Sequence, residues 1–173
     1  MLVILLIGVV FSAVSDELSL NNGALTISVE MVDQDNIKFL LKVDTGDWVG
    51  IGFGADMNDK DMFYVSGGNF HDAFSTSEST PGDDADQSDY IFTDLGADGY
   101  EISRVIAASD STDGEIVIGS GIQMSWARGS GGIANHGSNV GTWAFKLKKD
   151  LSVEITEGSA GILDGKGGAT NWY

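Results

Sequence analysis

Hydrophobic and polar residues alternate with a period of two in several short stretches of this chain. The first such stretch, residues 23–32, alternates apolar with mostly polar side chains, and its apolar members are Leu25, Ile27, Val29 and Met31. Residues 37–43 repeat the alternation after a short polar turn. A period of two places successive side chains on opposite faces of a strand, so the two stretches predict a β-hairpin with one buried face.

Further short apolar runs follow along the whole chain, at residues 48–53, 62–65, 70–74, 89–92, 100–107, 116–118, 122–127, 140–147 and 151–155. Turns rich in Gly, Asp, Asn and Ser separate these runs, and no stretch has the period of an amphipathic helix. The pattern therefore predicts an all-β protein, a sandwich of about nine to eleven strands in two packed antiparallel sheets. Gly50, Gly52 and Gly54 lie inside one run, where glycine often marks the close approach of a ligand or another backbone.

The composition limits the chemistry that the chain can perform. The chain has 173 residues, a length typical of one domain, and it contains no cysteine. The lack of cysteine excludes disulfides, thiolate metal sites and covalent haem attachment. The net charge of −17 argues against binding to nucleic acid or to anionic membranes, and solubility is its simplest explanation.

The N-terminal segment has the character of a secretory signal. Residues 1–15 are apolar and end in small residues, and two acids, Asp16 and Glu17, follow. A membrane anchor is the alternative, but the run is shorter than the ~20 apolar residues that a spanning helix needs. We therefore expect a signal peptide at 1–15, a single secreted domain at 16–173, and no membrane span after cleavage.

Several motifs occur in a fixed order along the chain. WVGIGFG at 48–54 is followed by Met57 in a polar loop, DMFYV at 61–65, FHDAFS at 70–75, IQMSWARG at 122–129 and NHG at 135–137. Together these motifs resemble the signature of DOMON domains (dopamine β-monooxygenase N-terminal-like) over residues 18 to about 155. Two departures are Gly50, where the family often has Ala, and His71, which has no expected counterpart.

The resemblance implies an immunoglobulin-like β-sandwich. In the better-understood members, the cytochrome domains of extracellular flavocytochromes, a non-covalent haem b is held by one Met and one His. Carried over by motif, the iron ligands are Met57 and His136. The expected pocket walls are Trp48, Phe53, Tyr64 and Trp126, because cofactor pockets are mostly apolar and aromatic.

Iron with both axial positions filled by protein transfers electrons and has no position for substrate. The resemblance therefore implies an electron carrier rather than a catalyst. We expect its separate redox partner to have a basic surface that matches the acidic chain.

The residues also have simpler interpretations. Met57 would fold back onto the core as a gap filler, and His136 would be an ordinary exposed loop histidine. His71 is the other histidine that a haem would require, and otherwise caps a strand or faces water. The acidic residues at 83–89 lack the spacing of an EF-hand and favour a solvated loop.

Two other functions remain open from the sequence. A haem-free module of the same fold would bind sugars or glycoconjugates through exposed tryptophans, with Trp48 and Trp172 as candidates. A structural protein of an extracellular coat would assemble through the edge strands of its sheets.

Overall fold

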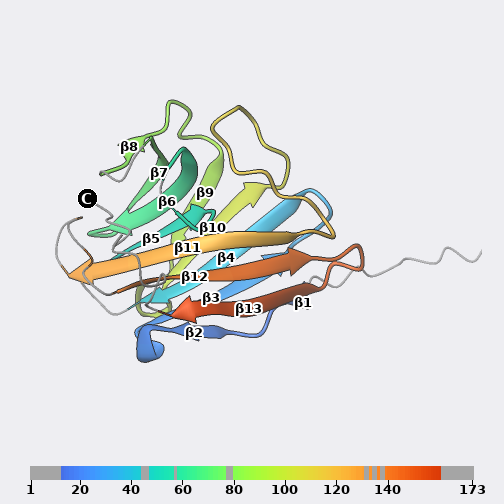
Figure 1. Cartoon of the computed structure of the whole chain (residues 1–173), viewed down its shortest axis with the longest axis horizontal. Helices are drawn as coiled ribbons and strands as arrows, with labels where there is room; N and C mark the ends of the chain where they lie inside the picture. Colours follow the sequence, from blue (N-terminus) through green and yellow to red (C-terminus); the bar gives the residue numbers. More distant parts are fainter. Residues whose placement is uncertain are drawn as a thin grey trace, which may run out of the picture.

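A computed structural model describes residues 13–43, 47–56, 58–76, 80–130, 133, 136 and 139–160. In these residues, 13 strands form two antiparallel sheets that pack as a sandwich (Figure 1). Two short 3-10 turns, η1 (Asn21–Gly23) and η2 (Gly96–Asp98), complete the described secondary structure. The all-β sandwich predicted from the sequence is confirmed. The strand count exceeds eleven because β1 and β8 are strands of two residues each.

The six-stranded sheet has the order β1-β3-β4-β10-β9, and β2 also pairs with β3. Its strands are β1 (Ala13–Val14), β2 (Leu18–Leu20), β3 (Leu25–Met31), β4 (Asn36–Val43), β9 (Tyr90–Asp94) and β10 (Tyr100–Val105). The hairpin expected from the first alternating stretches is β3–β4, with Leu25 opposite Val43 and Met31 opposite Ile37.

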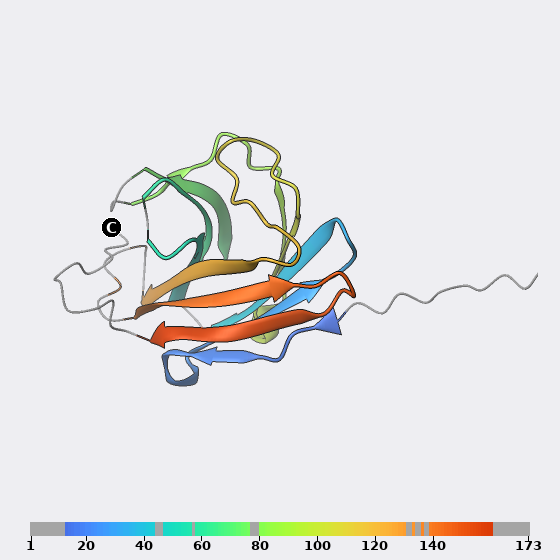
Figure 2. The ribbon, with the colours of Figure 1, turned by 45° about the vertical axis from the view of Figure 1, so that its right-hand side comes forward.

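The seven-stranded sheet has the order β13-β12-β11-β5-β6-β7-β8. Its strands are β5 (Asp47–Phe53), β6 (Lys60–Ser66), β7 (Asn69–Ser75), β8 (Gly82–Asp83), β11 (Gly121–Ser130), β12 (Val140–Leu147) and β13 (Val153–Ala160). Figure 2 shows the two layers from a second direction, with β13 lying next to β2 and β3 at one side of the sandwich.

Phe39 of β4 lies at the centre of the core between the sheets. Its ring centroid is 5.5 Å from that of Phe63 and 6.3 Å from that of Phe53, both in the opposite sheet. Trp143 and Phe145 of β12 contact the same ring at 6.5 Å and 5.9 Å. These edge-on and tilted contacts join the two sheets, as the alternating pattern required.

A polar cluster is buried at one end of this core. The Arg104 guanidinium donates to Asp61 Oδ2 at 2.7 Å and to the Tyr90 hydroxyl oxygen at 3.0 Å. The backbone N–H of Gly114 donates to the same Asp61 oxygen at 2.7 Å, which attaches the segment after β10 to the start of β6. Burial raises the pKa of Asp61, and the charge of Arg104 opposes that shift.

The described N-terminal residues extend the first sheet. Ala13 and Val14 pair with β3, and the N–H of Ser15 donates to the Val29 carbonyl at 2.8 Å. Residues 1–12 and the tail with Trp172 lie outside the described residues, so the signal peptide and the boundary after Ser15 stay predictions. The described part of the chain contains no helix long and apolar enough to cross a membrane.

Candidate functional site on the outer face of the seven-stranded sheet

A second apolar cluster lies on the face of the seven-stranded sheet that points away from the core. We call it the outer-face cluster, and its buried members are Trp48, Met62, Tyr64, Ala73 and Ala127. The cluster exists because successive side chains of β5 point to opposite faces of the sheet. Val49, Ile51 and Phe53 belong to the core, so residues 48, 50 and 52 point to the opposite face. Trp48 and Met62 are only 1% and 0% exposed, although their strand face is not part of the inter-sheet core.

The floor of the outer-face cluster consists of small residues in neighbouring strands. Across the sheet, Ala127 is opposite Gly50, and Ser125 is opposite Gly52. A Cβ atom placed on Gly52 would lie 2.8 Å from the Ser125 hydroxyl, so a larger residue would collide with its neighbour there. The sequence predicted the close approach of a ligand or another backbone at these glycines, and at Gly52 the close neighbour is the Ser125 side chain.

Larger side chains surround this floor. The Trp48 indole lies against Gly129, where an added Cβ would be 2.5 Å from its Nε1 atom. On the neighbouring strand, Gly50 is opposite Tyr64 and Gly52 is opposite Met62. The cluster is thus a buried apolar layer of small residues bordered by larger ones, and ligand sites are mostly apolar in this way.

Tyr64, His71 and Asp83 form the rim of the outer-face cluster on the β7 side. The rings of Tyr64 and His71 are stacked, with centroids 4.4 Å apart and planes 12° from parallel. His71 Nδ1 lies 3.0 Å from Asp83 Oδ1 of β8. Burial raises the pKa of Tyr64, and the carboxylate of Asp83 raises it further. His71 is therefore an ordered part of the rim, and its side chain is one-third exposed.

The loop between β11 and β12 contains a buried histidine and a residue that packs against the outer-face cluster. Ile133 of this loop packs against the cluster, and His136 is only 2% exposed. The His136 carbonyl accepts a hydrogen bond from the Asn139 N–H at 3.0 Å, which closes a turn just before β12. The interpretation of His136 as an exposed loop residue is therefore wrong.

Met57 lies outside the described residues, but the loop that carries it joins β5 to β6. This loop begins after Phe53, whereas the loop with His136 begins after Ser130, which is opposite Asp47 at the other end of β5. The two loops thus leave the sheet at opposite ends of the same strand. Met57 and His136 could therefore bind one iron only if both loops reached over the outer face of β5.

Phe53 and Trp126 lie on the other side of the sheet. Both belong to the inter-sheet core, and the Phe53 ring has the Arg104 guanidinium carbon 5.1 Å from its centroid. Of the residues predicted from the sequence, the structure groups Trp48 and Tyr64 in the outer-face cluster, with His136 in the loop beside it. Sequence reasoning missed Met62, Ala127 and Gly129, which the alternation within each strand could have assigned to this face.

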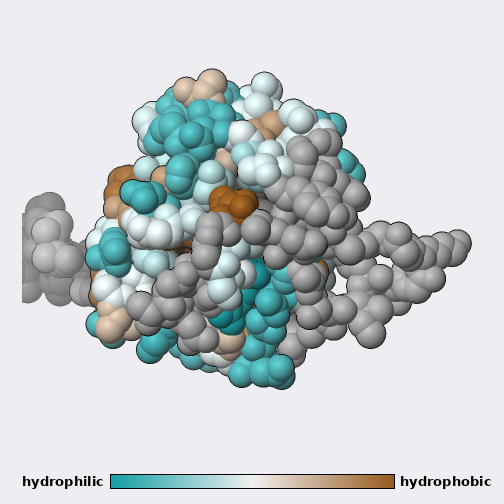
Figure 3. Space-filling view, turned by 90° about the vertical axis from the view of Figure 1, so that its left-hand side faces the viewer, coloured by the Kyte–Doolittle hydropathy of each residue, from teal (hydrophilic) through white to brown (hydrophobic). Residues whose placement is uncertain are grey.

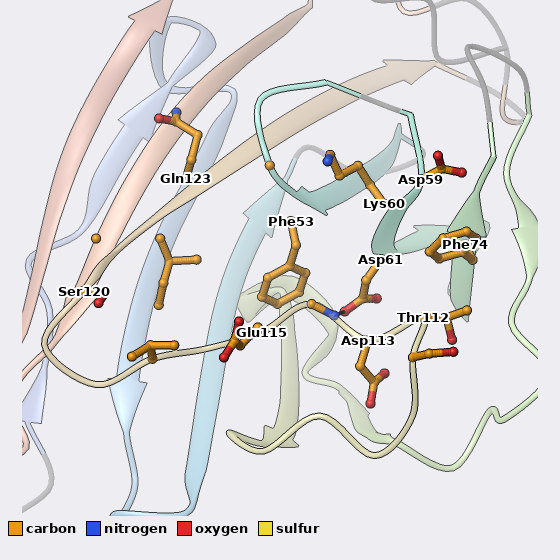
Figure 4. Close-up of a pocket in the computed structure, with 16 residues that line it drawn as sticks. Phe53, Asp59, Lys60, Asp61, Phe74, Thr112, Asp113, Glu115, Ser120 and Gln123 are labelled. Carbon is orange, nitrogen blue, oxygen red and sulfur yellow. Dashed lines mark hydrogen bonds between the residues drawn. The ribbon is translucent and has the colours of Figure 1, made fainter.

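A separate cavity of about 520 Å³ opens at the end of the sandwich beside the β5–β6 loop (Figure 4). The ring of Phe53 stands in its wall, and Lys60 contributes an ammonium group. Its lining also includes four carboxyl side chains, those of Asp59, Asp61, Asp113 and Glu115. An acidic cavity is a poor match for a haem, which has an apolar macrocycle and two anionic propionates, and the outer-face cluster fits that group better.

No group of three or more His, Cys, Asp or Glu side chains that could hold a metal ion occurs among the described residues. A single Met–His pair on a haem iron would not form such a group, so this result leaves Met57 and His136 as predictions. The iron of a haem would need only these two side chains from the protein.

Comparison with known proteins gives a similarity of fold. No protein-family model matches the chain, and no curated protein sequence matches it. The structure is similar to the solved cytochrome domain of cellobiose dehydrogenase from Myriococcum thermophilum, with a TM-score of 0.51 and 14% sequence identity. The match covers 79% of this chain and 83% of that domain. At this identity the similarity shows a shared fold, a two-sheet β-sandwich of the kind found in that cytochrome domain.

Proposed function

We propose that this chain is a secreted b-type cytochrome domain that binds one haem without covalent attachment and transfers single electrons. The axial ligands would be Met57 and His136. The observation that supports the proposal best is a buried apolar cluster on the outer face of the sheet, against which Ile133 of the His136 loop packs. The fold shared with a solved cytochrome domain agrees with this function.

The chain's own side chains fit the haem group. Gly50, Gly52 and Ala127 are the small residues against which a macrocycle would lie, and the almost fully buried Trp48 and Met62 would keep water away from it. A bound haem supplies one-electron chemistry, and a thioether ligand raises its reduction potential. Since both axial positions would be taken by protein, substrate would have no place on the iron.

The electron donor or acceptor would be a separate protein with a basic surface. The chain has a net charge of −17, which would attract a cationic partner over long range. Among the coloured residues of the end view in Figure 3, hydrophilic groups predominate and apolar ones form small patches. We expect the rate of electron transfer to fall as salt concentration rises, because salt screens this attraction.

Haem titration of the purified chain tests the proposal. The wild type should bind haem and show the sharp α band of a low-spin iron on reduction. Met57→Ala and His136→Ala should each lose that band. His71→Ala removes the other histidine, which lies in the rim, so it should weaken haem binding but keep the low-spin α band of the haem that is bound. No band in the wild type, or an unchanged band in both ligand variants, would rule out the proposed function.

One observation weakens the sugar-binding alternative. Trp48 is only 1% exposed, so its ring is not available to stack on a sugar, and Trp172 lies outside the described residues. Assembly through edge strands stays a prediction. A sharply monomeric species at high concentration would count against it.

A further inference from the structure

The segment that joins β7 to β9 pairs with β7 through the short strand β8, and a side-chain amide extends this attachment to Asp72. The amide group of Gln87 donates to the Asp72 carbonyl at 2.7 Å, and its oxygen accepts from the Asp72 N–H at 3.3 Å. The Asp84 N–H donates to the same carbonyl at 2.9 Å. Gln87 therefore takes the place of a strand partner. We call residues 82–88, held in this way, the Gln87 clip.

The side chain of Asp72 is buried behind the Gln87 clip. The residue is 2% exposed, and its Oδ2 atom is buried without a hydrogen-bond partner. It points to the core side of β7, because its cross-strand neighbour is the core residue Phe63. A charged carboxylate in this position would lack the donors that buried carboxylates need, so the protonated form is favoured.

The groups facing Asp72 come from several elements, and most are acidic. They are Asp61 of β6, Asp84 and Asp89 of the connecting segment, Tyr90 of β9, and Asp113 after β10. Arg104 of β10 is already engaged by Asp61 and Tyr90. Burial, and then repulsion led by Asp61, raise the pKa of Asp72 to about 8.

The Gln87 clip is connected to the rim of the outer-face cluster through β7 and β8. The two neighbours of Asp72 in β7, His71 and Ala73, face the outer side of the sheet. Ala73 is a buried member of the cluster and is opposite Asp83 of β8, and Asp83 in turn contacts His71 at 3.0 Å. Detaching residues 82–88 would therefore remove Asp83 from His71.

We propose that the protonated Asp72 side chain keeps the Gln87 clip closed, and that loss of this proton releases the clip and loosens the Tyr64–His71 rim. In the open state the carboxylate gains water as its partner, so ionisation favours opening. The consequence for haem binding at the outer-face cluster rests on the function proposed above, whereas the behaviour of the clip does not.

The direction of the pH dependence follows from the coupling between proton binding by Asp72 and the opening of the clip. The closed state holds the proton up to a pH of about 8, whereas an open Asp72 has the ordinary carboxyl pKa of about 4. Between these two values the open population should rise with pH, by up to about tenfold per pH unit. Above the higher value the rise should stop, because both states are then ionised.

Amide hydrogen exchange measured by NMR on the full chain without haem tests the clip. The reporters are the N–H groups of Asp72 and Asp84, which donate two of its bonds, with rates corrected for intrinsic exchange. In the wild type their protection should fall progressively from acidic to weakly alkaline pH. Asp72→Asn should be flat with pH, Gln87→Ala should be less protected at every pH, and the exposed-site control Asp35→Asn should follow the wild type.

The outcomes separate the two proposals. Protection that does not change with pH in the wild type, or that falls equally in Asp72→Asn, overturns the clip. If the clip behaves as expected, haem affinity should also weaken over the same pH range in the wild type but not in Asp72→Asn. A working clip in a protein that binds no haem would overturn the proposed function and leave the clip intact.

Discussion

The contact between Trp48 and Gly129 gives the sharpest test of the outer-face cluster. In Gly129→Ala, the new Cβ atom would lie 2.5 Å from Nε1 and 3.0 Å from Cε2 of the indole. Real Cβ atoms do not approach so closely, so Trp48 must move from a position where it is 1% exposed. Overpacking of this kind costs about 1–3 kcal/mol of unfolding free energy.

Gly121→Ala is the matched control for that substitution. Gly121 lies in the same strand, and nothing lies within 4 Å of its added Cβ. A substitution at such a site usually changes stability by no more than about 0.5 kcal/mol. Any difference between the two variants therefore reports the contact with Trp48 and not the general effect of replacing a glycine in β11.

Guanidinium unfolding, followed by circular dichroism and tryptophan fluorescence, measures the difference. A loss of about 2 kcal/mol would lower the midpoint of Gly129→Ala by roughly 0.5 M for a slope of about 4 kcal/mol/M. Haem affinity should fall with it if Trp48 forms a wall of the binding surface. Equal midpoints for the Gly129 and Gly121 variants would refute the placement of Trp48 and, with it, the shape of the outer-face cluster.

Three further predictions follow from the core and the N-terminus. Asp61→Ala should lower the free energy of unfolding by about 3 kcal/mol, because it leaves Arg104 buried with only the more distant carboxylate of Asp113, at 3.8 Å. The double variant with Arg104→Met should recover part of the loss in the same unfolding assay, and a double variant as unstable as the single one would contradict this. Phe39→Ala should lower the free energy of unfolding by about 3–5 kcal/mol, since it removes a ring that contacts four aromatic rings of the opposite sheet. Calorimetry measures the effect, and a fall in the unfolding temperature of less than about 4 °C would contradict this prediction. The intact mass of the exported protein should correspond to a chain beginning at Asp16, and retention of residues 1–15 would disprove the signal peptide.

The sequence was most informative about features that depend on residues close together in the chain. Alternation in 23–32 and 37–43 was enough to predict the β3–β4 hairpin and its buried side chains, because a strand has only two faces. The glycines at 50 and 52 indicated close approach before any neighbour was known. Burial of Asp61 was not predictable, since its partner Arg104 is 43 residues away in the chain.

In the candidate site, too, residue type was predictable from the sequence, whereas the face of the sheet that each residue occupies was not. Residue type and motif order predicted that Trp48, Tyr64 and His136 belong to one cofactor site. The structure brings Trp48 and Tyr64 together in one apolar cluster, and the cofactor site stays a prediction. Phe53 is also aromatic but lies on the opposite face, because it is an odd number of residues after Trp48 in β5.

By itself, the sequence determined that this chain is an all-β sandwich, that apolar and polar side chains alternate along its strands, and that β5 contains two glycines. Only the tertiary structure decided that the outward face of β5 is also buried, and which side chains from β6, β7 and β11 share it. The physical reason is that alternation specifies two faces for each strand, whereas the partners on a face depend on strand order and register across the sheet. Those long-range pairings depend on contacts between residues far apart in the chain, which no local pattern specifies.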